Sequence, residues 1–148
     1  MQFTKLLGNK LKSDQVIELL EHYDVDVIYD FDRLHEGTED VYWASFYEQG
    51  FQFRFNKEQT LDVIFLYMQE RDGFLYIHDN EVDVDVLSSF VEAKESFEEK
   101  GIEYITSPSD DPDHVLYQRW IKSKSGGFSA HYEFIKSKLR MITLSIVK

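Results

Sequence analysis

The sequence contains no cysteine, only two prolines and seven glycines, and no long run of apolar residues. Without cysteine the chain has no disulfide, no thiolate zinc site and no cysteine nucleophile, which fits a reducing compartment. No run reaches the roughly 18 apolar residues that span a bilayer, and the first residues lack the apolar core of a secretory signal. Because 43% of the residues are hydrophobic and 16% aromatic, we expect one cytoplasmic folded domain over residues 1–148.

Signatures of common catalytic sites are also missing. The sequence has no G-x-S-x-G elbow, no phosphate-binding loop and no dinucleotide fingerprint. Its five histidines lack the close spacing that prearranges a zinc site. The acidic run 79–85 resembles a calcium loop only superficially, because Val84 and Phe90 stand where the loop needs Gly and Glu. We therefore expect no enzyme activity, no metal and no cofactor.

The charge is strongly negative and unevenly distributed. The net charge is −12, and residues 79–113 hold twelve acidic against two basic residues. The last 35 residues reverse the sign, with seven Lys or Arg and Glu133 as their single acid. Such an acidic excess repels nucleic acid and anionic membranes and attracts basic proteins. A requirement for solubility alone is the simpler explanation.

The chain can be laid over itself at an offset of 77 residues. The coinciding landmarks are Trp43 with Trp120, Gly50-Phe51 with Gly127-Phe128 and, after one inserted residue, Leu61-x-x-Ile64-x-Leu66 with Leu139-x-x-Ile142-x-Leu144. Several coincidences at one offset indicate an internal duplication. We infer repeats over about 1–72 and 86–148, joined by an acidic segment, residues 73–85.

Each copy predicts one helix followed by strands. Ser13 is placed to cap a helix over about 14–23, and Ser89 with Glu92 forms a capping box for a helix that ends at Gly101. Besides a strand at each tryptophan, the predicted strands are 25–29, 51–55 and 60–68 in the first copy and 102–106, 128–134 and 139–147 in the second. The expected fold is α+β: an antiparallel sheet of up to eight strands from a tandem helix-β-β-β-β repeat, with two helices on one face.

The joining segment allows two interpretations. Residues 73–77 have the composition of an additional strand, and the alternation over 81–86 is typical of an edge strand with an acidic outer face. The simpler alternative is a linker.

The sheet face without helices is the candidate binding surface. Period-two alternation puts Ile64 and Leu66 on one side and Val63, Phe65 and Tyr67 on the other, so both sides are apolar. Exposed aromatic residues are typical interface anchors, although a curled sheet would bury them. The candidate partner-binding residues are Trp43, Tyr47, Arg54, Phe65, Tyr67 and Trp120 as anchors, and Asp79, Glu81, Asp83 and Asp85 for electrostatic steering.

The strand pattern resembles the duplicated fold of the β-lactamase-inhibitor-protein type. The similarity is carried by Tyr42-Trp43-Ala44-Ser45, Gly50-Phe51-Gln52-Phe53-Arg54-Phe55 and Leu61-Asp62-Val63-Ile64-Phe65-Leu66-Tyr67. Small acidic chains of this pattern also resemble immunity proteins of bacterial polymorphic-toxin and contact-dependent inhibition systems. The resemblance implies stoichiometric inhibition of a cognate toxin, with a negative surface docking over a basic, nuclease-like domain. The basic C-terminal third departs from this expectation.

Two other functions remain open at this stage. The aromatic sheet face would serve a small-ligand-binding or enzymatic domain as a pocket, which a deep cavity with converging polar groups would favour. An oligomerisation module would use an edge strand and form a stable homo-oligomer. The inhibitor hypothesis instead predicts a monomer or weak dimer whose affinity for its partner falls with salt.

Overall fold

A computed structural model describes residues 1–124 and 127–146 of the chain. Its elements are α1 (Phe3–Leu6), α2 (Asp14–His22), β1 (Val27–Asp30), β2 (Val41–Phe46), β3 (Phe51–Phe55), β4 (Leu61–Tyr67), the 3-10 helix η1 (Asp79–Glu81), α3 (Phe90–Lys100), β5 (Tyr104–Thr106), β6 (Trp120–Ser123), β7 (Phe128–Ile135) and β8 (Lys138–Ile146). The order helix, then four strands, occurs twice, beginning at α2 and at α3.

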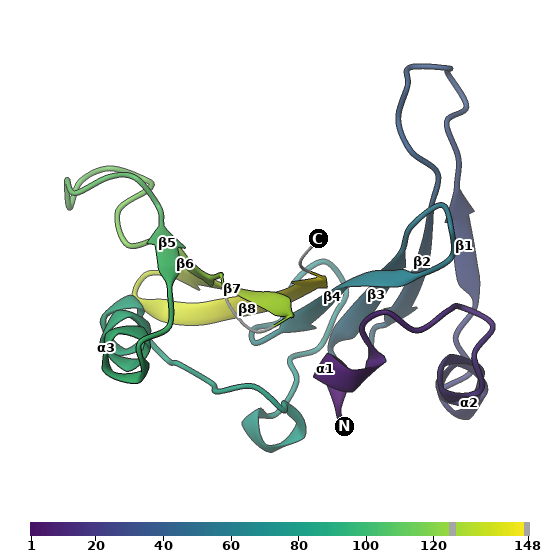
Figure 1. Ribbon diagram of the computed structural model, residues 1–148, viewed down its shortest axis with the longest axis horizontal. Coiled ribbons are helices and arrows are strands. Elements are labelled where there is room, and N and C mark those ends of the chain that lie inside the picture. Colours follow the sequence, from purple (N-terminus) through teal and green to yellow (C-terminus); the bar gives the residue numbers. More distant parts are fainter. Residues whose placement is uncertain (125–126, 147–148) are drawn as a thin grey trace.

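All eight strands form one antiparallel sheet in the order β1-β2-β3-β4-β8-β7-β6-β5. The closing strands of the two repeats, β4 and β8, pair in the middle, and β1 and β5 form the two edges. The helices lie on the same face of this sheet (Figure 1). The predicted α+β fold with an eight-stranded sheet and helices on one face is therefore confirmed.

The hydrophobic core lies between the sheet and the helices. The three phenylalanines of β3 alternate with Gln52 and Arg54, and all three are buried, as their period-two pattern predicts. From the helices, Val16 of α2 and Ala93 and Phe97 of α3 are buried against the sheet. Burial of this apolar stripe holds each helix on its own half of the sheet.

The helix signals in the second repeat act as predicted. The Ser89 hydroxyl accepts a hydrogen bond from the Glu92 amide at 3.1 Å, and Gly101 ends α3 with a φ of 67°. The Glu92 carboxylate accepts from the amide and hydroxyl of Ser88 rather than of Ser89. In the first repeat Ser13 is the N-cap residue of α2, but its side chain makes no capping hydrogen bond.

Details of the duplication recur in both halves. Just after α2, the Val25 amide donates a hydrogen bond to the Leu20 carbonyl. Just after α3, the Ile102 amide donates one to the Phe97 carbonyl. Both halves also contain a register shift in the pairing of their last two strands. It lies between Arg54 and Phe55 where β3 pairs with β4, and between Glu133 and Phe134 where β7 pairs with β8. The two repeats therefore have the same irregularity at structurally equivalent places.

One part of the sequence alignment is wrong. In the sheet Phe51 lies opposite Leu66, and Ala130 lies opposite Leu144, which is the counterpart of Leu66. Ala130 is therefore the equivalent of Phe51, and Phe128 is not. Trp120 pairs with Glu133, thirteen positions further on, whereas Trp43 pairs with Arg54, eleven positions further on, so equal spacing from tryptophan to glycine does not give equal spacing to the paired residue.

The joining segment is a linker that packs under the sheet. The structure forms no strand over residues 73–77 or 81–86, both of which it describes, and η1 lies between them. The Leu75 amide bonds the Tyr47 carbonyl at 2.9 Å, and the Ile77 amide bonds the Tyr67 carbonyl at 2.8 Å. The last predicted strand ends at Ile146 in the structure, and Val147 lies outside the described residues.

Candidate functional site

The sheet face opposite the helices, here called the open face, carries a connected set of half-buried side chains. The register of the strands brings them together, because every second residue of each strand points away from the helices. Its central members are Trp43, Arg54, Val63, Phe65, Trp120, Lys122, His131, Glu133, Met141 and Thr143, all of intermediate exposure.

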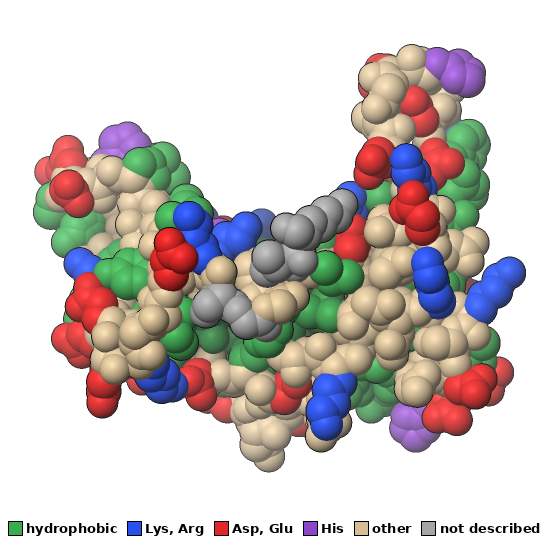
Figure 2. Space-filling model, viewed as in Figure 1, with side chains coloured by type: hydrophobic (Ala, Val, Ile, Leu, Met, Phe, Trp, Pro, Cys, Tyr) green, Lys and Arg blue, Asp and Glu red, His purple; other side chains and the backbone are tan. Residues whose placement is uncertain are grey.

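The open face is concave. The sheet curls, and the loops that follow β1 and β5 project beyond it at the two ends of the molecule (Figure 1). Figure 2 shows the hollow between these two arms. We call residues 31–40 the first arm and residues 107–119 the second arm. The shape is that of a cradle with a β-sheet floor, open toward a guest rather than enclosed.

Local hydrogen bonds give each arm a defined shape. In the first arm Asp40 accepts from the Tyr29 hydroxyl at 2.6 Å and from the Asp32 amide at 3.1 Å. In the second arm the Ser107 hydroxyl accepts from the amides of Arg119 and Trp120 at 3.0 and 3.4 Å. Short polar side chains that bond nearby backbone amides stabilise loops in this way. The cradle walls are therefore structured.

Both tryptophans of the chain belong to the floor of the cradle. Trp43 packs beside Phe65 with ring centroids 6.1 Å apart, and Trp120 stacks on His131 at 5.3 Å. Burial lowers the pKa of His131 below its ordinary value, while Glu133 opposes that shift and Lys122 adds to it. The stacked imidazole is therefore held toward its neutral form.

The two tryptophans have cross-strand neighbours of opposite charge. Trp43 lies opposite Arg54, and Trp120 lies opposite Glu133. Arg54 and Glu133 flank the equivalent bulges of the two repeats. Glu133 is the common partner of Arg71, Arg119 and Arg140 in ion pairs with N···O distances of 3.7, 3.6 and 3.9 Å. The Glu133 carboxylate on the open face is thus surrounded by three arginine side chains.

The structure places four of the predicted anchors on one face of the sheet, with four strands between Trp43 on β2 and Trp120 on β6. Trp43, Arg54, Phe65 and Trp120 all lie on the open face with part of each side chain exposed. A strict period-two reading of residues 120–123 and 128–135 would also have found Lys122, His131 and Glu133, which sequence reasoning missed.

Tyr67 is not available as an anchor, contrary to expectation. The ring of Phe74 stacks on it with centroids 4.1 Å apart, and only 7% of the residue is exposed. Burial raises the pKa of its hydroxyl. Tyr47 packs on the other side of Phe74 at 4.4 Å and remains exposed at the end of the sheet. Tyr67 is buried because the linker returns to the sheet and places Phe74 on its ring. The strand pattern gave no indication of this contact.

The predicted acidic residues lie on the helix side, away from the open face. Asp83 accepts hydrogen bonds from the amide and hydroxyl of Thr4 in α1 at 3.0 and 2.7 Å. Asp85 pairs with Lys100 of α3 at 2.5 Å, and Asp79 and Glu81 are the ends of η1, below the sheet in Figure 1. The ten predicted residues therefore divide between two sides of the molecule and do not form one contact surface.

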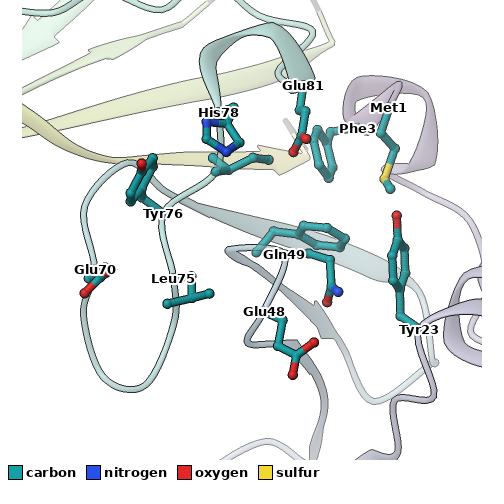
Figure 3. Close-up of a pocket in the computed structure, with 12 residues that line it drawn as sticks. Met1, Phe3, Tyr23, Glu48, Gln49, Glu70, Leu75, Tyr76, His78 and Glu81 are labelled. Atoms are coloured by element: carbon teal, nitrogen blue, oxygen red, sulfur yellow. The ribbon is translucent and has the colours of Figure 1, made fainter.

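A separate pocket of about 510 Å³ lies on the helix side, between the N-terminus and the linker (Figure 3). Aromatic side chains, among them Phe3, Tyr23 and Tyr76, line it together with three glutamates. Figure 3 shows Glu48, Glu70 and Glu81 at separate points around the cavity. The polar groups do not converge as they do in most small-molecule sites.

Within residues 1–124 and 127–146, no group of three or more His, Asp or Glu side chains is placed to hold a metal ion. No helix in this part of the chain has the length and apolar character needed to cross a bilayer. Comparisons with protein-family models, with curated proteins and with solved structures gave no match.

Proposed function

We propose that the chain is an immunity-type inhibitor that acts in the cytoplasm and neutralises a cognate toxin by stoichiometric binding in its cradle. The observation that carries the proposal is the concave open face, on which Trp43, Phe65 and Trp120 present part of their rings between two structured arms. Aromatic residues at the centre of a concave patch are the usual anchors of tight interfaces. A convex segment of the toxin fits this shape.

The charge distribution supports a protein guest rather than nucleic acid. The net charge of −12 attracts a basic toxin domain over long distances, and each arm carries at least three acidic residues. On the floor, Arg54 and Lys122 instead offer cations to carboxylates of the guest. A polyanion would have to pass the acidic arms to reach those cations. Inhibition by occlusion needs no catalytic group on this chain.

The experiment is a rescue assay with the C-terminal domain of the protein encoded immediately upstream, which the proposal predicts to be a basic toxin. Co-expression of the wild-type chain is expected to restore growth, and the purified proteins are expected to bind one to one with an affinity that falls as salt rises. Because both tryptophans lie in the cradle, their fluorescence reports occupancy directly.

Variants of the floor sharpen the assay. Trp43→Ala combined with Phe65→Ala is expected to weaken binding at least about a hundredfold, as removal of two central anchors does. Tyr76→Ala is the matched control, since Tyr76 is an exposed aromatic residue on the helix side. Equal binding by both variants, or no rescue by the wild type, would contradict the proposal. Salt-independent affinity would remove its electrostatic part.

A further inference from the structure

The outer edge of β1 is an unpaired strand edge. β1 is the first strand of the sheet order, and in the described part of the chain it has a strand neighbour on one side only, β2. Antiparallel strands direct alternate backbone N–H and C=O groups to both sides, so the outer side of β1 offers a hydrogen-bonding row to another chain. Proteins protect such edges unless they use them.

Apolar side chains are concentrated beside this edge. Twelve large hydrophobic residues are exposed among residues 1–124 and 127–146, and four of them lie within seven positions at β1 and the start of the first arm. They are Ile28 (62% exposed), Tyr29 (45%), Phe31 (47%) and Leu34 (76%). At the other edge, β5 has only Ile105 in this class. An apolar cluster next to an open edge is the usual setting for strand addition.

Acidic residues decide what kind of strand fits. Asp30 is the last residue of β1, and Asp26 directly precedes the strand, so the two lie two positions after and before Ile28; an extended partner that continues past Val27 would meet all three on one side. Antiparallel pairing of β1 with β1 of a second copy, centred on Ile28, would place Asp26 against Asp30 twice. Like charges directly opposite each other destabilise a sheet, whereas Lys or Arg at those positions would form favourable pairs.

We propose that β1 receives an extended segment of a basic protein partner as an added strand, with Lys or Arg at two positions that flank an aliphatic residue. The aliphatic residue packs on Ile28, the cations pair with Asp26 and Asp30, and the opposite side of the segment covers Tyr29 and Phe31. Ile28 lies opposite Trp43 in the register, so this edge continues the floor of the cradle. The proposed function supplies the identity of the partner, but the edge site does not depend on it.

The test uses peptides and therefore does not need the toxin. A short capped peptide, Thr-Lys-Val-Ile-Val-Lys-Thr, is titrated into the isotopically labelled chain, and amide chemical shifts and hydrogen exchange are followed. We expect shifts and new amide protection concentrated in residues 26–31. The same peptide with Glu in place of Lys is expected to bind at least about tenfold more weakly.

Charge reversal on the chain completes the design. Asp26→Lys with Asp30→Lys is expected to reverse the preference, so that the glutamate peptide binds better than the lysine peptide. Glu95→Lys with Glu99→Lys on α3 changes the net charge equally and is expected to leave the preference unchanged, because both residues are exposed on the far helix. Well-dispersed spectra of both variants show that each is folded.

Three results would overturn the inference. One is equal binding of the two peptides, another is lysine-peptide shifts spread over the acidic helix side instead of β1, and the third is loss of preference in the α3 variant. A chain that dimerises through β1 in the absence of peptide would likewise show that a second copy is the occupant. A failed rescue assay combined with peptide binding at β1 would reject the proposed function alone.

Discussion

Phe65 of β4 lies directly opposite Thr143 of β8 in the register of the two central strands. The two residues hold the same position in the two repeats. On either side of them, Ile64 pairs with Leu144, the counterpart of Leu66, and Leu66 pairs with Ile142, the counterpart of Ile64. The pseudo-two-fold axis of the sheet therefore passes between Phe65 and Thr143, at the centre of the open face. The binding face we propose is built around this axis.

Neighbouring residues of β4 are expected to differ sharply in their contribution to stability. Leu66 is fully buried under the helices, so Leu66→Ala should lower the free energy of unfolding by about 2–5 kcal/mol. Phe65 faces the cradle and is partly in water, so Phe65→Ala should cost less than about half as much. Urea denaturation of both variants measures the difference. Equal losses would mean that the monomer itself seals the open face.

Gly50 is expected to tolerate no side chain. Its φ is +83°, and a Cβ there would lie 2.5 Å from the Leu75 carbonyl oxygen and 2.7 Å from the Ile77 amide nitrogen. Gly50→Ala should therefore cost about 3 kcal/mol or more, because the linker must move away from the sheet. Gly101→Ala is the control, with a φ of +67° and no atom within 4 Å of the added Cβ. It should cost only about 1 kcal/mol in thermal or urea unfolding.

His131 is expected to make the chain less stable in mild acid. Burial lowers its pKa in the folded state, so the unfolded chain binds the proton more readily. The stabilising contribution of neutral His131 is complete above a pH of about 6.5 and is lost as the pH falls through the lowered pKa. Urea midpoints of wild type and His131→Gln, compared at about pH 7.5 and about pH 5.5, test this. A variant with the same acid-induced loss as wild type would refute it.

Tyr29 is expected to ionise unusually late. The hydrogen bond from its hydroxyl to Asp40 raises the pKa of Tyr29 to about 12, because ionisation would break the bond and bring two negative charges together. Asp40→Asn should return that pKa toward its ordinary value of about 10. Ultraviolet titration of the two proteins measures the shift. An unchanged titration would mean that the first arm is not held by this bond in solution.

Local patterns were sufficient to predict most of the fold. The alternation in residues 51–55, the Ser89 cap and the glycine at position 101 each act within a few residues, so one sequence was enough to place the strand and the helix that contain them. The alignment of Gly50-Phe51 with Gly127-Phe128 failed because two more residues separate Trp120 from its partner Glu133 than separate Trp43 from Arg54. Turn length is the property that a duplicated sequence changes most freely.

The site was predicted only in part, because some of its contacts join segments that are far apart in the sequence. The alternation rule indicates which face Trp43 and Phe65 occupy, and both lie there. It contains no information on where the linker returns, so the burial of Tyr67 under Phe74 and the position of Asp83 beside Thr4 were not foreseen. Such contacts depend on tertiary packing between segments without a shared local pattern.

Arg54 and Glu133 hold equivalent places in the two repeats but carry opposite charges. In a dimer of two identical chains, a residue near the symmetry axis must appear twice with the same charge. Here the two halves belong to one polypeptide, so equivalent positions need not match, and the first half has the cation Arg54 where the second has the anion Glu133. A partner bound in the cradle as we propose would meet opposite charges in the two halves, which favours a single bound orientation.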